Sequence, residues 1–226
     1  MKRPFDTILL DLGGTLDGRG GWRDRFDRLF DECGFAGACS RDGRARAFEY
    51  AEAQGKATPQ MSSARLDEMV RRHVAWQFEA LGAADMEAAE RVAGRFIADV
   101  ELACVVSRRV IATLAREGYR LGVVSNGCGN AAVLCEQYGF SPFLSVVVDS
   151  HRVGAAKPDP AIFHHALDRM HADPSHSACV GDSVVNDIEP AKALGLRTFW
   201  IAAGRSAVSP AIDVTLETIA ELPERL

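Results

Sequence analysis

The sequence lacks any apolar run close to the length of a membrane span. A transmembrane helix needs roughly 20 consecutive apolar residues, whereas charged side chains interrupt every long segment of these 226 residues. The segment that precedes Asp11 also contains too few apolar residues for a secretory signal. We therefore expect a cytoplasmic protein without a membrane partner.

Positive charge is scarce. The 26 Lys and Arg residues are outnumbered by 31 Asp and Glu residues, which gives a formal net charge of −5. Lysine is the rarer basic residue, with only Lys2, Lys56, Lys157 and Lys192. A mildly acidic chain without a basic face argues against nucleic acid as the main partner. A local positive charge is still compatible with an anionic substrate.

The spacings typical of zinc sites and disulfide frameworks are missing as well. None of the cysteines forms a C-x-x-C pair, and the six histidines contain no H-E-x-x-H pattern. The six cysteines are Cys33, Cys39, Cys104, Cys128, Cys135 and Cys179. We predict free, mostly buried thiols.

Residues 18–103 show the apolar spacing of helices and no run typical of a strand. Apolar residues recur three and four positions apart, as in Leu66, Met69 and Val70. About four helices are expected, with breaks near 34–40, 55–62 and 82–85. This all-helical insert is predicted to be a mobile cap, with hinges near 18–21 and 105–107.

The remaining segments, 1–17 and 104–226, alternate between helical and strand-like patterns. Expected helices are 107–117, 131–138, 161–170 and 189–194, and expected strands are 8–10, 120–124, 144–148, 178–180 and 198–201. Such alternation is typical of an α/β fold with a parallel sheet. We therefore predict a Rossmann-like parallel sheet sandwiched by helices, with the cap inserted after the first strand.

Acidic residues follow two of the expected strands. Asp11 comes directly after the first strand, and Asp182 and Asp187 follow the strand at 178–180. Open parallel sheets bind ligands at the carboxyl ends of their strands. Three carboxylates gathered there would need a cation. The turn 13–15 after Asp11 has amides suited to an anion.

Two further segments place polar side chains at the same edge. Ser125 and Asn126 end the second strand, where they are suited to donate hydrogen bonds to a phosphoryl oxygen. Lys157 precedes Pro158, and the prolines of this loop fix its conformation. The Lys157 ammonium is therefore expected to point into the site.

These four segments, in this order, resemble the signature segments of the haloacid dehalogenase-like hydrolase superfamily. The helical insert also lies where that family has a helical cap, between the first and second motifs. The resemblance implies that Asp11 is a nucleophile that forms an aspartyl-phosphate and that Ser125 binds phosphate. It implies that Lys157 joins nucleophile and phosphate, and that Asp182 and Asp187 bind magnesium.

By the same resemblance the protein is a phosphomonoester hydrolase that acts on a small phosphorylated metabolite with Mg²⁺, as a monomer or homodimer. The backbone carbonyl of Gly13 completes the metal ligands beside Asp11, Asp182 and Asp187. Substrate binding is assigned to Gly14, Thr15, Ser125 and Asn126. A carboxylate that attacks a phosphate dianion is repelled by it, so cations are also required on physical grounds.

One position departs from the family pattern. Phosphatases of this family usually carry a second aspartate two residues after the nucleophile, where this chain has Gly13. A missing general acid typically costs roughly 10²–10⁴-fold in rate. Three consequences are open. The leaving group of the substrate needs little protonation, as in an anomeric, acyl or aryl phosphate; the cap supplies another acid; or activity is reduced.

Three other functions remain open at this stage. A haloacid dehalogenase would not need an acid at Gly13, but it would have no use for a magnesium site. A carbon–phosphorus hydrolase would need a cap lysine, and Lys56 is the only one in the insert. A non-catalytic phospholigand-binding protein would keep the pocket without turnover.

Overall fold

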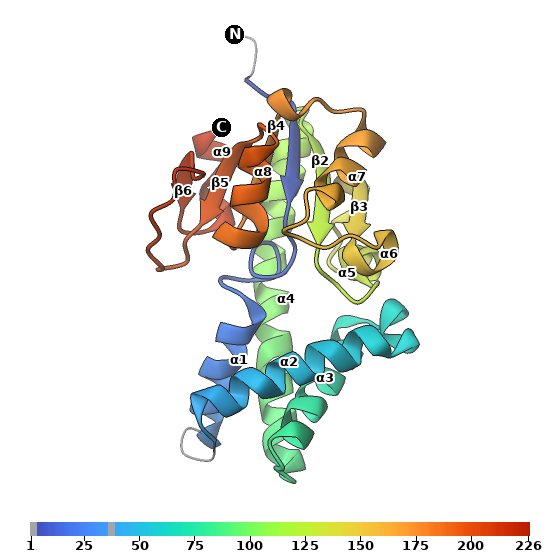
Figure 1. Cartoon of the computed structure of the whole chain (residues 1–226), viewed down its shortest axis with the longest axis vertical. Coiled ribbons are helices and arrows are strands. Elements are labelled where there is room, and N and C mark those ends of the chain that lie inside the picture. Colours follow the sequence, from blue (N-terminus) through green and yellow to red (C-terminus); the bar gives the residue numbers. More distant parts are fainter. Residues whose placement is uncertain (1–3, 36–38) are drawn as a thin grey trace.

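The computed structural model describes residues 4–35 and 39–226. An α/β core forms one end of the molecule and a helical cap forms the other, and the long helix α4 (Met86–Arg116) runs through both (Figure 1). In the described part of the chain, no helix is both long enough and apolar enough to cross a membrane.

The core is built on a parallel sheet, as the sequence predicts. Its six strands lie in the order β3-β2-β1-β4-β5-β6, and every neighbouring pair is parallel. The strands are β1 (Thr7–Leu10), β2 (Arg120–Ser125), β3 (Leu144–Asp149), β4 (Ser177–Gly181), β5 (Arg197–Ile201) and β6 (Val214–Leu216). Strand β6 is the one strand of this sheet that was not predicted, because a run of three residues is too short to show a recognisable period.

Alternation along β1 sends side chains to both faces of the sheet. Ile8 and Leu10 pack on the face covered by α4 and α5, whereas Leu9 packs on the face covered by α7 and α8. The core helices are α5 (Ala131–Gln137), α6 (Ser150–Val153), α7 (Ala161–Met170), α8 (Glu189–Ala193) and α9 (Leu222–Arg225). Helices therefore cover both faces, which confirms the predicted fold class.

The cap consists of α1 (Trp22–Phe30), α2 (Arg41–Ala57), α3 (Leu66–Ala80) and the first half of α4. The three expected breaks separate these helices, although residues 36–38 of the first break lie outside the described residues. Aromatic rings fill the cap interior: Phe26 stacks on Phe96 with ring centroids 4.2 Å apart.

Helix α4 differs from the prediction. A helix was expected to begin at Ser107 with a hinge at 105–107, but α4 continues without a break for 31 residues. Neither glycine nor proline occurs from Arg95 to Glu117, and buried residues keep a spacing of three or four through the supposed hinge. A cap that moves must therefore do so with an intact helix at this connection.

Polar contacts hold the cap against the carboxyl edge of the sheet. Arg152 donates hydrogen bonds to the Gly129 carbonyl at 2.8 Å and to the Ser62 carbonyl in the cap at 3.0 Å. The Asn130 side chain donates to the carbonyl of Ala64, also in the cap, at 3.0 Å. These contacts close the cap over the ends of β1, β2 and β4.

Candidate active site

The three predicted acidic residues meet at the ends of two neighbouring strands. Strand β1 pairs with both β2 and β4, so its carboxyl end lies where the strand order reverses. The Asp11 amide continues the pairing and donates to the Val180 carbonyl at 2.9 Å. Asp11, Asp182 and Asp187 are all buried, and each offers a carboxylate oxygen within 4.8 Å of the others.

Lys157 lies among these carboxylates. Its Nζ donates to Asp11 at 2.5 Å, to Asp187 at 2.7 Å and to the Val124 carbonyl at 3.1 Å. Burial opposes the charged form of Lys157, but the two carboxylates outweigh burial and hold its pKa above the ordinary value. The ammonium therefore stays protonated, and it points inward as the sequence predicts.

Acidic groups outnumber basic groups at this point. Burial raises the pKa of Asp11 to about 8, with Lys157 acting against burial and Asp187 adding to it. Burial also raises the pKa of Asp182 to about 6, and Asp187 adds to the effect. The Lys157 ammonium and the Arg205 guanidinium do not balance three ionised carboxylates, so the oxygen-only donor set suits a hard divalent cation such as Mg²⁺.

Asp187 is held on both of its carboxylate oxygens. Oδ1 accepts from Lys157, and Oδ2 accepts from the Ser183 amide at 3.0 Å. The close approach depends on Gly181, because a methyl group there would lie 2.4 Å from Cβ of Asp187. Of the three acids, Asp187 is therefore the one fixed most completely by the protein.

Gly14 and Thr15 do not line the pocket, contrary to the predicted role in substrate binding. The Gly14 amide donates to Asp17 Oδ1 at 2.8 Å, so it is not available to an anion. The Thr15 hydroxyl is buried, without a described hydrogen-bond partner. Gly14 instead makes room, since a Cβ there would lie 2.8 Å from the Asp182 carboxylate.

Ser125 and Asn126 do reach the pocket, but the Asn126 side chain has another task. Its Nδ2 donates to the Lys157 carbonyl at 2.9 Å, and its Oδ1 accepts from the Lys157 amide at 2.8 Å. Asn126 thus fixes the backbone that carries the ammonium, a role the sequence analysis did not foresee. The Ser125 hydroxyl makes no hydrogen bond to the described residues and lines the pocket.

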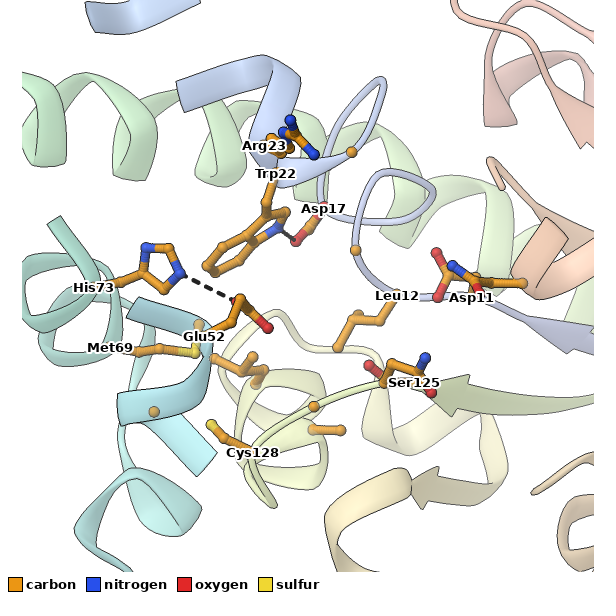
Figure 2. Close-up of a pocket in the computed structure, with 18 of the residues that line it drawn as sticks. Asp11, Leu12, Asp17, Trp22, Arg23, Glu52, Met69, His73, Ser125 and Cys128 are labelled. Carbon is orange, nitrogen blue, oxygen red and sulfur yellow. Dashed lines mark hydrogen bonds and ion pairs between the residues drawn. The ribbon is translucent and has the colours of Figure 1, made fainter. Parts of the chain in front are cut away.

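The acidic cluster forms one end of a cavity of about 430 Å³ between core and cap. Figure 2 shows Asp11 and Ser125 on the core side, with Glu52, Met69 and His73 on the cap side. Lys56 is exposed at the end of α2 and does not line this cavity. A Schiff base between Lys56 and a substrate therefore has no support in the structure.

A buried network near the first motif escaped the sequence analysis. Asp17 accepts hydrogen bonds from Trp22 Nε1 at 2.7 Å and from Arg25 at 3.3 Å. The sequence offered no signal for it, because a glycine-rich stretch separates Asp17 from Trp22 and Arg25 and only the fold brings them together. Trp22 both packs on Phe96 and lines the cavity.

Arg205 is a second residue that the sequence analysis missed. Its Nη2 lies 3.1 Å from Asp182 Oδ2 and 2.9 Å from the Asp182 carbonyl. It follows β5 in a loop without a recognisable motif. The guanidinium partly neutralises Asp182 in this conformation.

The chain is similar to known proteins in sequence and in fold. The family model described as haloacid dehalogenase-like hydrolase matches residues 5–195. A haloacid dehalogenase-like hydrolase domain-containing protein 3 from Bos taurus is 35% identical over 97 residues, which cover 43% of this chain and 38% of that protein. A glyceraldehyde 3-phosphate phosphatase from Pyrococcus abyssi is 33% identical over 102 residues, which cover 44% of this chain and 42% of that protein.

The chain therefore spans less than half the length of these two curated relatives. A phosphatase structure from Thermococcus onnurineus has a TM-score of 0.61 at 20% identity, and the match covers 98% of this chain and 97% of that one. Dehalogenase structures are similar to a comparable degree. At such identities the likeness shows the fold alone.

Proposed function

Because this chain belongs to the haloacid dehalogenase-like hydrolases, we propose that it is a magnesium-dependent phosphatase that works through an aspartyl-phosphate on Asp11. The observation that carries the proposal is the position of Lys157, whose ammonium joins Asp11 to Asp187 within a cluster of three buried acidic residues. Such a site attracts both a divalent cation and a phosphate.

The residues present fit a magnesium ion. Asp11, Asp182 and the Gly13 carbonyl are the proposed direct ligands, and Asp187 acts through water because Lys157 and Ser183 already occupy its oxygens. When bound, the ion supplies positive charge that offsets the repulsion between the nucleophile and the phosphate. The loose coordination typical of Mg²⁺ leaves room for a phosphoryl oxygen.

In the first step an Asp11 oxygen attacks phosphorus. Lys157 and Ser125 hold the phosphoryl oxygens, and the strand end of β1 keeps the nucleophile in place. The bond from phosphorus to the leaving oxygen breaks, and its electron pair stays on that oxygen. Since Gly13 has no proton to donate, the leaving group must depart as a stable anion.

In the second step water attacks the phosphorus of the aspartyl-phosphate. The bond to Asp11 breaks, Asp11 regains its carboxylate, and the proton from water leaves with the released phosphate or passes to solvent. The closed cap limits the water that reaches the site.

We propose that the substrate is a small phosphorylated metabolite and that the protein is cytoplasmic. The proposed catalytic core consists of residues 1–17 and 104–226, and the proposed cap consists of residues 18–103.

Phosphate release from acetyl phosphate tests the proposal. We expect turnover that depends on Mg²⁺ and stops with EDTA, and a loss of roughly 10³-fold or more in Asp11→Asn. The control is Asp168→Asn, because Asp168 is exposed on α7 and does not line the cavity. Full activity in Asp11→Asn would refute the assignment of the nucleophile.

The same assay separates the remaining alternatives. Metal-independent release of halide from a 2-haloacid, without phosphate release from acetyl phosphate, would identify a dehalogenase. Binding of inorganic phosphate without any hydrolysis would identify a phospholigand-binding protein. Either result would replace the phosphatase proposal.

A further inference from the structure

The space beside Gly13 is occupied by an indole ring. A Cβ at Gly13 would lie 3.7 Å from both Cδ1 and Nε1 of Trp22. Asp17 holds this ring, since it accepts from Trp22 Nε1 at 2.7 Å while it also caps the Gly14 amide. The position that has no proton donor is therefore covered by a fixed aromatic surface.

The cap side of the cavity continues this apolar surface. Trp22, Phe48 and Trp76 line it together with Met61 and Met69. Rings and thioethers of this kind form favourable contacts with a flat aromatic ligand. The cavity thus has a charged end, where the carboxylates and the Lys157 ammonium lie, and an aromatic end in the cap.

Glu52 is the acidic group of the cap wall among the described residues. Its carboxylate accepts a hydrogen bond from His73 at 3.1 Å (Figure 2), while His73 Nδ1 is engaged by Gln77 at 2.9 Å. Burial alone would raise the pKa of Glu52, but the hydrogen bond with His73, together with the electrostatic attraction of His73 and Lys56, outweighs burial and lowers that pKa. Glu52 is therefore an anion at neutral pH.

Of the three Lys and Arg side chains among the described residues that line the cavity, two are already paired with acids and the third is Arg23. Lys157 is bound to Asp11 and Asp187, and Arg205 is paired with Asp182. Arg23 is exposed at the rim. A substrate with a second negative charge on its leaving group would meet the Glu52 carboxylate, which disfavours its binding.

We propose, on the basis of the phosphatase function above, that the substrate is an aryl or an aroyl phosphate. Its leaving group is aromatic and carries no charged substituent. The ring lies against Trp22 in the aromatic end of the cavity, and the phosphate lies at Asp11. When the bond from phosphorus breaks, the electron pair stays on the leaving oxygen as a phenolate or benzoate. Resonance stabilises that anion, so no proton from position 13 is needed.

Two acyl phosphates separate ring binding from leaving-group chemistry. Benzoyl phosphate and acetyl phosphate both release a carboxylate, but only the first carries a ring. We expect kcat/KM to be at least about tenfold higher for benzoyl phosphate, mainly through a lower KM. 2-Phosphoglycolate, which carries a carboxylate, should be the poorest of the three. Asp11→Asn gives the background of spontaneous hydrolysis.

Two tryptophan variants of the cap test whether the rings cause the preference for benzoyl phosphate. Trp22→Leu and Trp76→Leu should each lower the ratio of kcat/KM for benzoyl over acetyl phosphate by about tenfold. The matched control is Tyr50→Phe on helix α2, because Tyr50 points outward and bonds to Glu79 at 3.3 Å. This control should leave the ratio unchanged. Glu52→Gln should improve the relative use of 2-phosphoglycolate.

Each outcome decides a different claim. Equal use of both acyl phosphates by the wild type, a preference for 2-phosphoglycolate, or an unchanged ratio in both tryptophan variants would overturn the aromatic subsite but leave the phosphatase in place. No phosphate release from any of the three compounds would overturn the phosphatase itself. If Trp22→Leu does not fold, as judged by lost thermal unfolding, the Trp76→Leu ratio decides.

Discussion

At the scale of single residues, the site depends on the absence of side chains as much as on their presence. Gly14 leaves space to the Asp182 carboxylate and Gly181 leaves space to Asp187, whereas a methyl group at Gly13 would make ordinary contact with Trp22. Gly14 also has a φ of 86°, which L side chains rarely adopt. Glycines thus bring backbone and carboxylates into close contact where the charges have to converge.

Gly181 offers a direct measurement of this effect. In Gly181→Ala the added methyl group would collide with Asp187, so we expect the free energy of unfolding to fall by about 1–3 kcal/mol, with a clear loss of phosphatase activity. Gly94→Ala is the control, because no atom lies within 4 Å of the added Cβ in α4. That variant should be as stable as the wild type or more stable. Urea unfolding measures both, and equal effects would contradict the steric explanation.

Asn126 shows how far a residue type can be interpreted without the fold. Its position after β2 correctly placed it at the site, but its amide binds both the amide and the carbonyl of Lys157 instead of facing the substrate. The role depends on a loop 31 residues away. No local pattern contains that information.

At the scale of elements, α4 decides how the cap is attached. The helix carries Phe96 in the cap interior and Ile111 in the core, so one continuous element belongs to both parts (Figure 1). Movement of the cap must therefore be absorbed by the glycine-rich segment 18–21 and by bending of α4. This differs from the predicted pair of loop hinges.

Val105 tests the continuity of α4. Val105→Pro removes a backbone donor and crowds the preceding turn, so we expect the free energy of unfolding to fall by about 3 kcal/mol or more. Val105 is 40% exposed, and the control Val105→Ala should change stability little. Both are measured by urea unfolding. A proline variant as stable as the wild type would indicate a real break at the predicted hinge.

At the scale of the whole molecule, the excess of buried acid beneath the cap couples ion binding to stability. A cation that binds only the folded state stabilises the protein by about 2.7 kcal/mol at a hundred times its Kd. We therefore expect MgCl₂ to raise the melting temperature, in the absence of any substrate.

Calorimetry with and without MgCl₂ measures this shift. Asp182→Asn removes a proposed ligand from the cluster and should abolish the shift, whereas Asp168→Asn on the surface of α7 should retain it. A shift of equal size in both variants would show that magnesium acts elsewhere on the protein.

The sequence by itself determined the sheet, the helical insert and the residues at the strand ends. Periodicity of two or 3.6 residues is a local property, and the polar residues that follow Ile8–Leu10 and Ala178–Val180 lie at strand ends in any parallel arrangement. Asp11, Ser125, Asp182 and Asp187 could therefore be placed at this edge in advance, whereas Lys157 was placed there by the prolines of its loop and by the family resemblance.

Only the tertiary structure decided what surrounds those residues. The contact of Trp22 with Gly13, the pairing of Arg205 with Asp182 and the position of Glu52 on the cap wall all join segments without a shared local pattern. Such contacts are set by how the cap packs on the sheet. The residues at the phosphate end could therefore be predicted from short motifs. The shape and charge of the cavity around the leaving group depend on packing between segments that no local pattern connects.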